Sequence, residues 1–247
     1  FAKLSPAALA RAMDVFQRQN AAALYARAGN ALATTASPAD DRLLRSRMPE
    51  YAEFLLASDP ANGPRRAVDD YLAAARRANS PFARAAMFNG AGRTLLDRLA
   101  NDPKAEECFS ESLKFADRGN DDAIRAAWIG MGDVHRRRGD GAKALDAYTK
   151  AEKMRPPLSA NQVAVDVGSY ARAVEYYIRR GQFDDARRNL EDWDWQFPTH
   201  KLAGYSTLLW VRYYQARKEH ARAVREAADL VASAERSNYA PELLLAA

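Results

Sequence analysis

Apolar and small residues recur at three- and four-residue intervals along most of the chain, in paired segments separated by short polar turns. The clearest pair lies within residues 125–158, where Gly139-Asp140-Gly141 separates the two segments and Pro156-Pro157 follows the second. Its recurring small and bulky positions are Trp128, Met131, Gly132 and His135, then Ala144, Tyr148 and Ala151. This spacing is typical of α-helices, and glycine and proline end them, so the segment is predicted to form a helical hairpin.

Similar hairpin patterns occur on both sides of this pair. In these four pairs and in the central one, an alanine stands where the two helices are expected to cross: Ala67, Ala105, Ala144, Ala186 and Ala223. Gly90-Ala91-Gly92 is placed in the middle of a helix at such a crossing, and not in a phosphate-binding loop. Alanine is the best helix former and β-branched residues are scarce, so the sequence predicts an all-α fold.

The order of residues in the central pair resembles the tetratricopeptide repeat family. The match runs through Trp128, Gly132 and His135 in the first helix, then Ala144, Tyr148 and Pro156. The resemblance implies a right-handed α-solenoid of about five to six helix-turn-helix pairs. The alanines at the crossings are farther apart than the family's repeat of about 34 residues, so we expect longer helices or connections.

We predict a single solenoid over residues 1–247, without an internal linker. Residues 1–47 are expected to form N-terminal capping helices, with a helix start at Ser37-Pro38, and residues 48–236 five helix pairs. Residues 237–247 look like the start of a further, truncated helix. Because its leucines would lack a partner, we expect the natural chain to continue past Ala247, and the start at Phe1 suggests processing or trimming.

Charge adds little to this picture. The formal net charge is +5, from 37 basic and 32 acidic residues that are interspersed along the chain. Such mixing is typical of solvated helix faces, and no nucleic-acid-reading motif accompanies it, so no nucleic-acid partner is expected. No stretch is apolar enough to span a bilayer. The single cysteine, Cys108, is expected to be a packing residue, which leaves the compartment open between bacterial cytoplasm and periplasm.

Residues that could carry chemistry do not cluster in the sequence. The histidines His135, His200 and His220 lie in different repeats, and no pair has zinc-ligand spacing. No nucleophile elbow or dinucleotide fingerprint occurs. Paired acids such as Asp69-Asp70 and Asp184-Asp185 are interpreted as residues near helix starts that favour the helix dipole. We therefore expect no catalytic site, no cofactor and no metal.

The family resemblance implies that the first helix of each pair lines a concave groove. Its candidate partner-binding residues are Asp133, Arg136, Arg137, Arg172, Glu175, Arg179, Tyr205 and Arg212. Arginine and tyrosine often anchor interfaces, although the same residues could simply be exposed polar positions. Asp133 and Glu175 stand where family members that bind a chaperone's acidic tail have asparagine. That departure favours a ligand segment of mixed or basic charge.

A second candidate surface is the aromatic segment Trp193–Phe197. We expect Trp193 to fill a gap between repeats, whereas Trp195 points elsewhere on its helix and is a candidate partner contact.

Three functions remain compatible with the sequence. The first is a scaffold or adaptor that binds a protein or peptide segment in its groove. The alternative is a regulatory or substrate-recruiting module of a larger enzyme or envelope-assembly complex, and a peptide or small-ligand sensor is the third. The choice of the first rests on family analogy, since a fold alone does not fix function.

Overall fold

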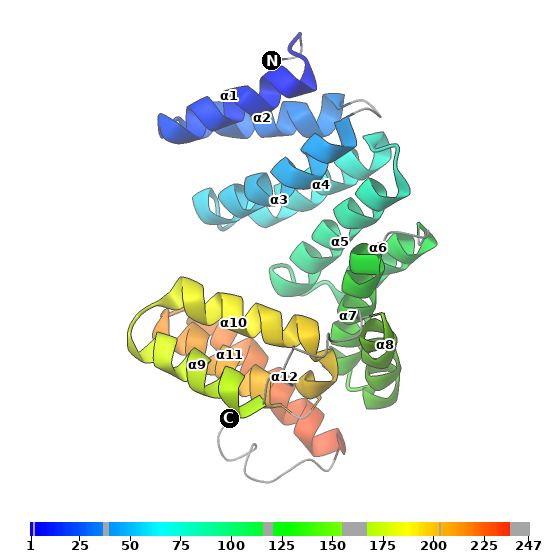
Figure 1. Cartoon of the computed structure of the whole chain (residues 1–247), viewed down its shortest axis with the longest axis vertical. Coiled ribbons are helices and arrows are strands. Elements are labelled where there is room, and N and C mark those ends of the chain that lie inside the picture. Colours follow the sequence, from blue (N-terminus) through cyan, green and yellow to red (C-terminus); the bar gives the residue numbers. More distant parts are fainter. Residues whose placement is uncertain (2, 37–39, 116–120, 155–166, 203, 238–247) are drawn as a thin grey trace, which may run out of the picture. The chain divides into compact units, whose positions relative to one another are not determined.

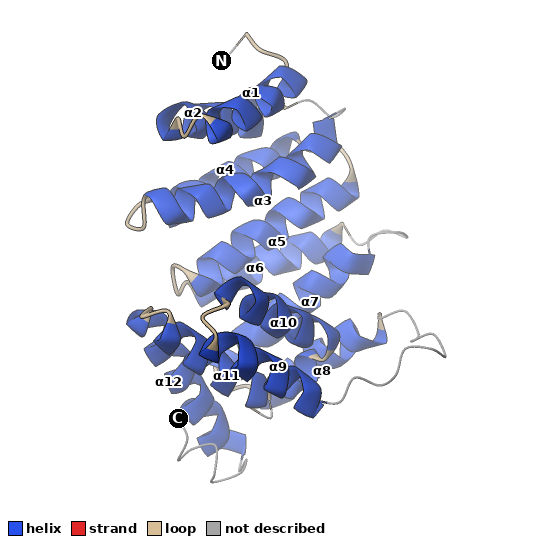
Figure 2. Cartoon of the chain, turned by 60° about the vertical axis from the view of Figure 1, so that its left-hand side comes forward, coloured by secondary structure: helices blue, strands red, loops and turns tan. Residues whose placement is uncertain are grey.

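The computed structural model describes residues 1, 3–36, 40–115, 121–154, 167–202 and 204–237. Within these ranges all regular structure is helical and no strand occurs, so the all-α prediction is confirmed (Figure 2). The described elements are α1 (Pro6–Arg18), α2 (Ala22–Thr35), α3 (Asp41–Ser58), α4 (Gly63–Arg77), α5 (Pro81–Asp97), α6 (Asp102–Lys114), α7 (Asp121–Arg137), α8 (Gly141–Lys153), α9 (Val167–Arg179), α10 (Phe183–Gln196), the 3₁₀ helix η2 (Pro198–Lys201), α11 (Tyr205–Ala216) and α12 (His220–Ser237) (Figure 1).

The chain divides into two compact units, Phe1–Met131 and Gly132–Ala247, and the boundary falls within α7. In the first unit, α1 and α2, α3 and α4, and α5 and α6 form successive hairpins (Figure 1). Each hairpin also packs on the next, because α2 contacts α4 and α3 contacts α5. Ser5, Ser80 and Asn101 cap helices in this unit by accepting hydrogen bonds from backbone N–H groups.

The second unit contains the hairpins α9–α10 and α11–α12, with α11 packed against both α9 and α10. α8 contacts η2 and α12 in the same unit. Positive φ angles at Gly139 and Gly181 follow α7 and α9 and allow the tight turns predicted there. Trp193 is fully buried in the core of this unit, as expected of a residue that fills a gap.

The small residues that the sequence places at helix crossings are buried in the structure. All five predicted alanines are buried: Ala67, Ala105, Ala144, Ala186 and Ala223. Gly132 lies against the ring of Tyr148, and a Cβ atom at this position would overlap that ring. Gly92 is inside α5, and a Cβ atom there would come within 2.8 Å of Phe109 Cε1. These close approaches explain why the pattern requires small residues.

Some details differ from the expectations. Met48, taken as the start of the first full pair, lies inside α3. The interpretation of Asp69-Asp70 as a helix-start pair is wrong, because both residues lie midway along α4, and Asp70 is buried there. Asp184 and Asp185 do lie in the first turn of α10. The helix start at Ser37-Pro38, the stop at Pro156-Pro157 and the truncated helix at 238–247 lie outside the described residues.

Candidate partner-binding face

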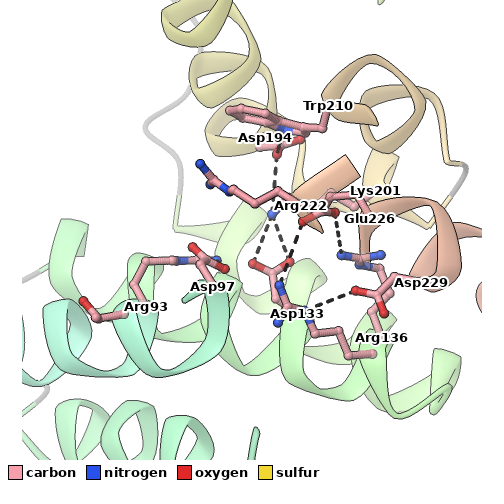
Figure 3. A network of polar contacts seen from close by, with 12 residues as sticks. Arg93, Asp97, Asp133, Arg136, Asp194, Lys201, Trp210, Arg222, Glu226 and Asp229 are labelled. Atoms are coloured by element: carbon pink, nitrogen blue, oxygen red, sulfur yellow. Dashed lines mark hydrogen bonds and ion pairs between the residues drawn. The ribbon is translucent and has the colours of Figure 1, made fainter. Parts of the chain in front are cut away.

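Asp133 on α7 was predicted to face a ligand, but its side chain is buried, with only 3% of the residue exposed. The Tyr148 hydroxyl donates a hydrogen bond to Asp133 Oδ1 at 2.7 Å. The ammonium of Lys201, from η2, donates to both carboxylate oxygens at 2.9 and 3.1 Å (Figure 3). Burial, followed by the negative charge of Asp133, raises the pKa of Tyr148 well above its ordinary value, so the hydroxyl stays a donor.

Lys201 extends this polar network to two further helices of the second unit. Its Nζ atom lies 3.6 Å from Asp194 Oδ2 on α10. The same oxygen accepts a 2.8 Å hydrogen bond from the indole Nε1 of Trp210 on α11 (Figure 3). A buried carboxylate is tolerable only when it is paired and hydrogen-bonded, and this arrangement satisfies that requirement for Asp133.

The neighbouring cations on α7 are also held within the second unit. The side chain of Arg136 is only 6% exposed and lies 4.0 Å from Glu226 on α12. Arg137 lies 3.9 Å from Glu226 and 3.3 Å from Asp229. Asp133, Arg136 and Arg137 are therefore brought together by the fold, and their described partners are side chains of α8, η2 and α12.

Three consecutive residues of η2 each contact a different part of the second unit. Thr199 donates two hydrogen bonds to Glu152 Oε1 of α8, from its backbone N–H at 3.1 Å and its hydroxyl at 2.6 Å. His200 Nδ1 accepts a 3.1 Å hydrogen bond from the buried indole of Trp193. Lys201 binds Asp133 as described above. This short segment thus connects α7, α8 and α10.

The remaining predicted residues on α9 and α11 form an exposed charged surface, which we call the α9–α11 face. Its members are Arg172, Glu175, Tyr176 and Arg179 on α9, Arg180 directly after that helix, and Arg212 on α11. Glu175 joins the two helices, because its Oε1 atom accepts a 2.5 Å hydrogen bond from Arg212 Nη1. Its Oε2 atom lies 3.5 Å from Arg179 Nη2. Arg172, Glu175, Arg179 and Arg212 were in the predicted set.

The structure says less about the last two predicted contact residues, Trp195 and Tyr205. Trp195 is half-buried on α10. Tyr205 is the first residue of α11, and its side chain lies outside the described part of the structure.

We next consider metal sites, membrane-spanning helices and a reactive thiol. Among the described residues, histidine, cysteine and acidic side chains nowhere gather into a group able to hold a metal ion. Over the same ranges, no helix is both long and apolar enough to cross a bilayer. Cys108 is buried on α6, and burial, with smaller contributions from Glu107 and Glu111, raises the pKa of its thiol to about 11. Such a thiol is a weak nucleophile at neutral pH.

Comparison of the chain with models of known protein families, with curated proteins and with solved structures found no match.

The sequence pattern did not reveal the residues that neutralise Asp133, Arg136 and Arg137 on α7. Lys201 lies in a 3₁₀ segment, outside the helical periodicity, and its partner Asp133 is far away in the sequence. Glu226 and Asp229 look like ordinary surface acids of an amphipathic helix. One signal for the contact between Asp133 and Tyr148 was present in the sequence. The repeat pattern places Asp133 directly after Gly132, and Gly132 is expected to pack near Tyr148.

Proposed function

We propose that this chain is a non-catalytic scaffold or adaptor that binds a protein or peptide segment on the α9–α11 face. In this proposal its helical hairpins are tetratricopeptide-like repeats of a right-handed solenoid, and α9 and α11 are the first helices of successive pairs.

The repeat interpretation is supported by the hairpins of both units and by their helix crossings. The alanines placed at crossings by the sequence pattern are all buried, and Gly132 packs on Tyr148 within the segment that carries the family signature. Repeated hairpins that pack on their neighbours are typical of arrays that present an extended binding surface.

One observation carries the assignment of the face. α9 and α11 belong to successive hairpins, yet their exposed charged side chains meet, since Glu175 pairs with Arg179 of its own helix and Arg212 of the next. By contrast, Asp133 and Arg136 on α7 are buried and paired within the fold. A surface shared by two repeats can contact one ligand segment along its length.

The test is a pull-down from the source organism with the parent chain and a face variant, Arg172→Glu/Arg179→Glu/Arg212→Glu. A matched control, Lys150→Glu/Arg187→Glu/Arg188→Glu, makes the same charge change on α8 and α10. We expect a partner that the parent and the control retain and the face variant loses. A partner retained equally by all three proteins would refute this assignment of the face.

A further inference from the structure

The α9–α11 face has more positive than negative charge among its described side chains. Among the described residues Arg179 and Arg212 share one carboxylate, that of Glu175, so it neutralises at most half of their combined charge. The side chains of Arg179 and Arg212 are 80% and 48% exposed. Because exposed ion pairs contribute little to stability, a ligand that replaces Glu175 disturbs the fold very little.

An exposed aromatic side chain lies next to these charges. Tyr176, which follows Glu175 on α9, is 54% exposed. The guanidinium carbon of Arg180 lies 5.7 Å from the centre of its ring and adds a further positive charge. Tyrosine and arginine are the residue types that most often dominate the energy of protein interfaces. The face therefore combines cations with an apolar contact surface.

The sequence favoured a mixed-charge or basic ligand because two acids, Asp133 and Glu175, were expected to face it. Asp133 does not contribute to such a surface, since it is buried and bound by Lys201 and Tyr148. Only Glu175 remains at the α9–α11 face, and it lies between two arginines. The fold also withdraws Arg136 and Arg137, which pair with acids of α12, so the surface stays positive but presents one acid to a ligand instead of two.

We infer that the partner segment bound by the α9–α11 face is acidic, and that its carboxylates displace Glu175 from Arg179 and Arg212. This inference rests on the proposed function. Arginine binds a carboxylate through two parallel hydrogen bonds, which Glu175 cannot offer to both guanidinium groups at once. An apolar residue beside the acidic positions then packs against Tyr176.

The test measures fluorescence anisotropy with short dye-labelled probes: a peptide of Glu, Leu and Ala, its counterpart with Lys in place of Glu, and a single-stranded oligonucleotide. The acidic peptide is expected to bind best. Glu175→Gln removes the internal competitor and should tighten its binding by about threefold, whereas Arg179→Glu/Arg212→Glu should weaken it by about tenfold or more. Tyr176→Ala should weaken binding by about threefold or more.

A charge-matched control separates the face from the net charge of the chain. Arg187→Glu/Arg188→Glu changes two exposed arginines on α10 by the same total charge and should alter binding by less than about twofold. An equal loss in this control would mean that the acidic peptide only senses net charge, which overturns the inference. Circular dichroism of every variant checks that its helices are intact.

Other outcomes overturn the inference, and each has its own consequence for the proposed function. Preference for the basic peptide, with weaker binding of that peptide to Glu175→Gln, would show a basic partner on the same face and keep the scaffold proposal. Tighter binding of the oligonucleotide, lost in Arg179→Glu/Arg212→Glu, would assign the face to nucleic acid and remove both. Absence of binding by all probes overturns the acidic segment, and the pull-down then decides the scaffold proposal.

Discussion

In the described part of each unit, a buried aspartate lies against a tyrosine that also packs on a glycine. In the first unit, Tyr51 donates a 2.9 Å hydrogen bond to Asp70, and its ring lies against Gly29. In the second, Tyr148 donates to Asp133 at 2.7 Å, and its ring lies against Gly132. The glycine lets the ring approach the neighbouring helix, and the carboxylate then satisfies the buried hydroxyl.

The two aspartates differ in their second partner. Asn30 on α2 donates a 2.7 Å hydrogen bond to Asp70, so both donors that contact this carboxylate directly in the described structure are neutral, and the charge of Arg66 acts on it only as a smaller influence. Asp133 instead receives the ammonium of Lys201, from a segment outside the α-helices. A helix crossing can therefore be completed by an amide of a neighbouring helix or by a cation from a turn. In the second arrangement, more of the stability depends on one side chain, that of Lys201.

The largest effect expected from the loss of one polar partner comes from Lys201→Met. It leaves the Asp133 carboxylate buried without its cation, so we expect a loss of about 3–5 kcal/mol in the stability of the second unit. Denaturant unfolding followed by tryptophan fluorescence reports mainly on this unit, because three of the four tryptophans, Trp193, Trp195 and Trp210, belong to it. Lys150→Met is the control, since its ion pair with Asp146 is exposed. Equal losses in the two variants would contradict the difference between buried and surface pairs.

An intermediate effect is expected from Gly132→Ala and Gly29→Ala, which place a methyl group against Tyr148 and Tyr51. Each overpacked crossing should cost about 1–3 kcal/mol, and Gly132→Leu should unfold its hairpin. Gly141→Ala is the control, because no atom lies within 4 Å of the added Cβ. Circular dichroism during denaturation measures all of these variants. Unchanged melting of Gly132→Leu would show that the repeat frame is wrong.

The smallest expected effect is the pH dependence of the stability change caused by replacing Asp70. Burial raises the pKa of Asp70 above its ordinary value, although hydrogen bonds from Tyr51 and Asn30 and the charge of Arg66 oppose the rise, and the charge of Asp69 adds to it. Because the folded state has the higher pKa, protonated Asp70 stabilises the fold at low pH, and this contribution is lost as the pH rises through the folded pKa. Asp70→Asn should therefore cost more stability at about pH 4 than at about pH 7.

The measurement is denaturant unfolding of Asp70→Asn at both pH values, with Glu107→Gln, at an exposed position of α6, as a matched loss of one charge in the same unit. A larger cost of Asp70→Asn at neutral pH would mean that its hydrogen bonds outweigh burial.

Much of the fold follows from local patterns, whereas the partners of the charged residues do not. The turns at Gly139 and Gly181 and the buried crossing alanines could be predicted, because each depends on residues within one hairpin. The role of Asp133 could not, since a helical period tells which residues share a face but not which distant charge reaches that face. Glu175 and Arg212 were both placed on the exposed surface, yet their pairing also joins two hairpins.

The arrangement of η2 has a consequence for how the length of the chain can vary. Connections between helical repeats usually tolerate inserted residues, because little in the fold depends on their register. Thr199, His200 and Lys201 must reach three different helices in consecutive order. One residue added or removed here would misdirect all three at once, so related chains that keep this network should differ in length elsewhere and preserve the spacing from Trp193 to Lys201.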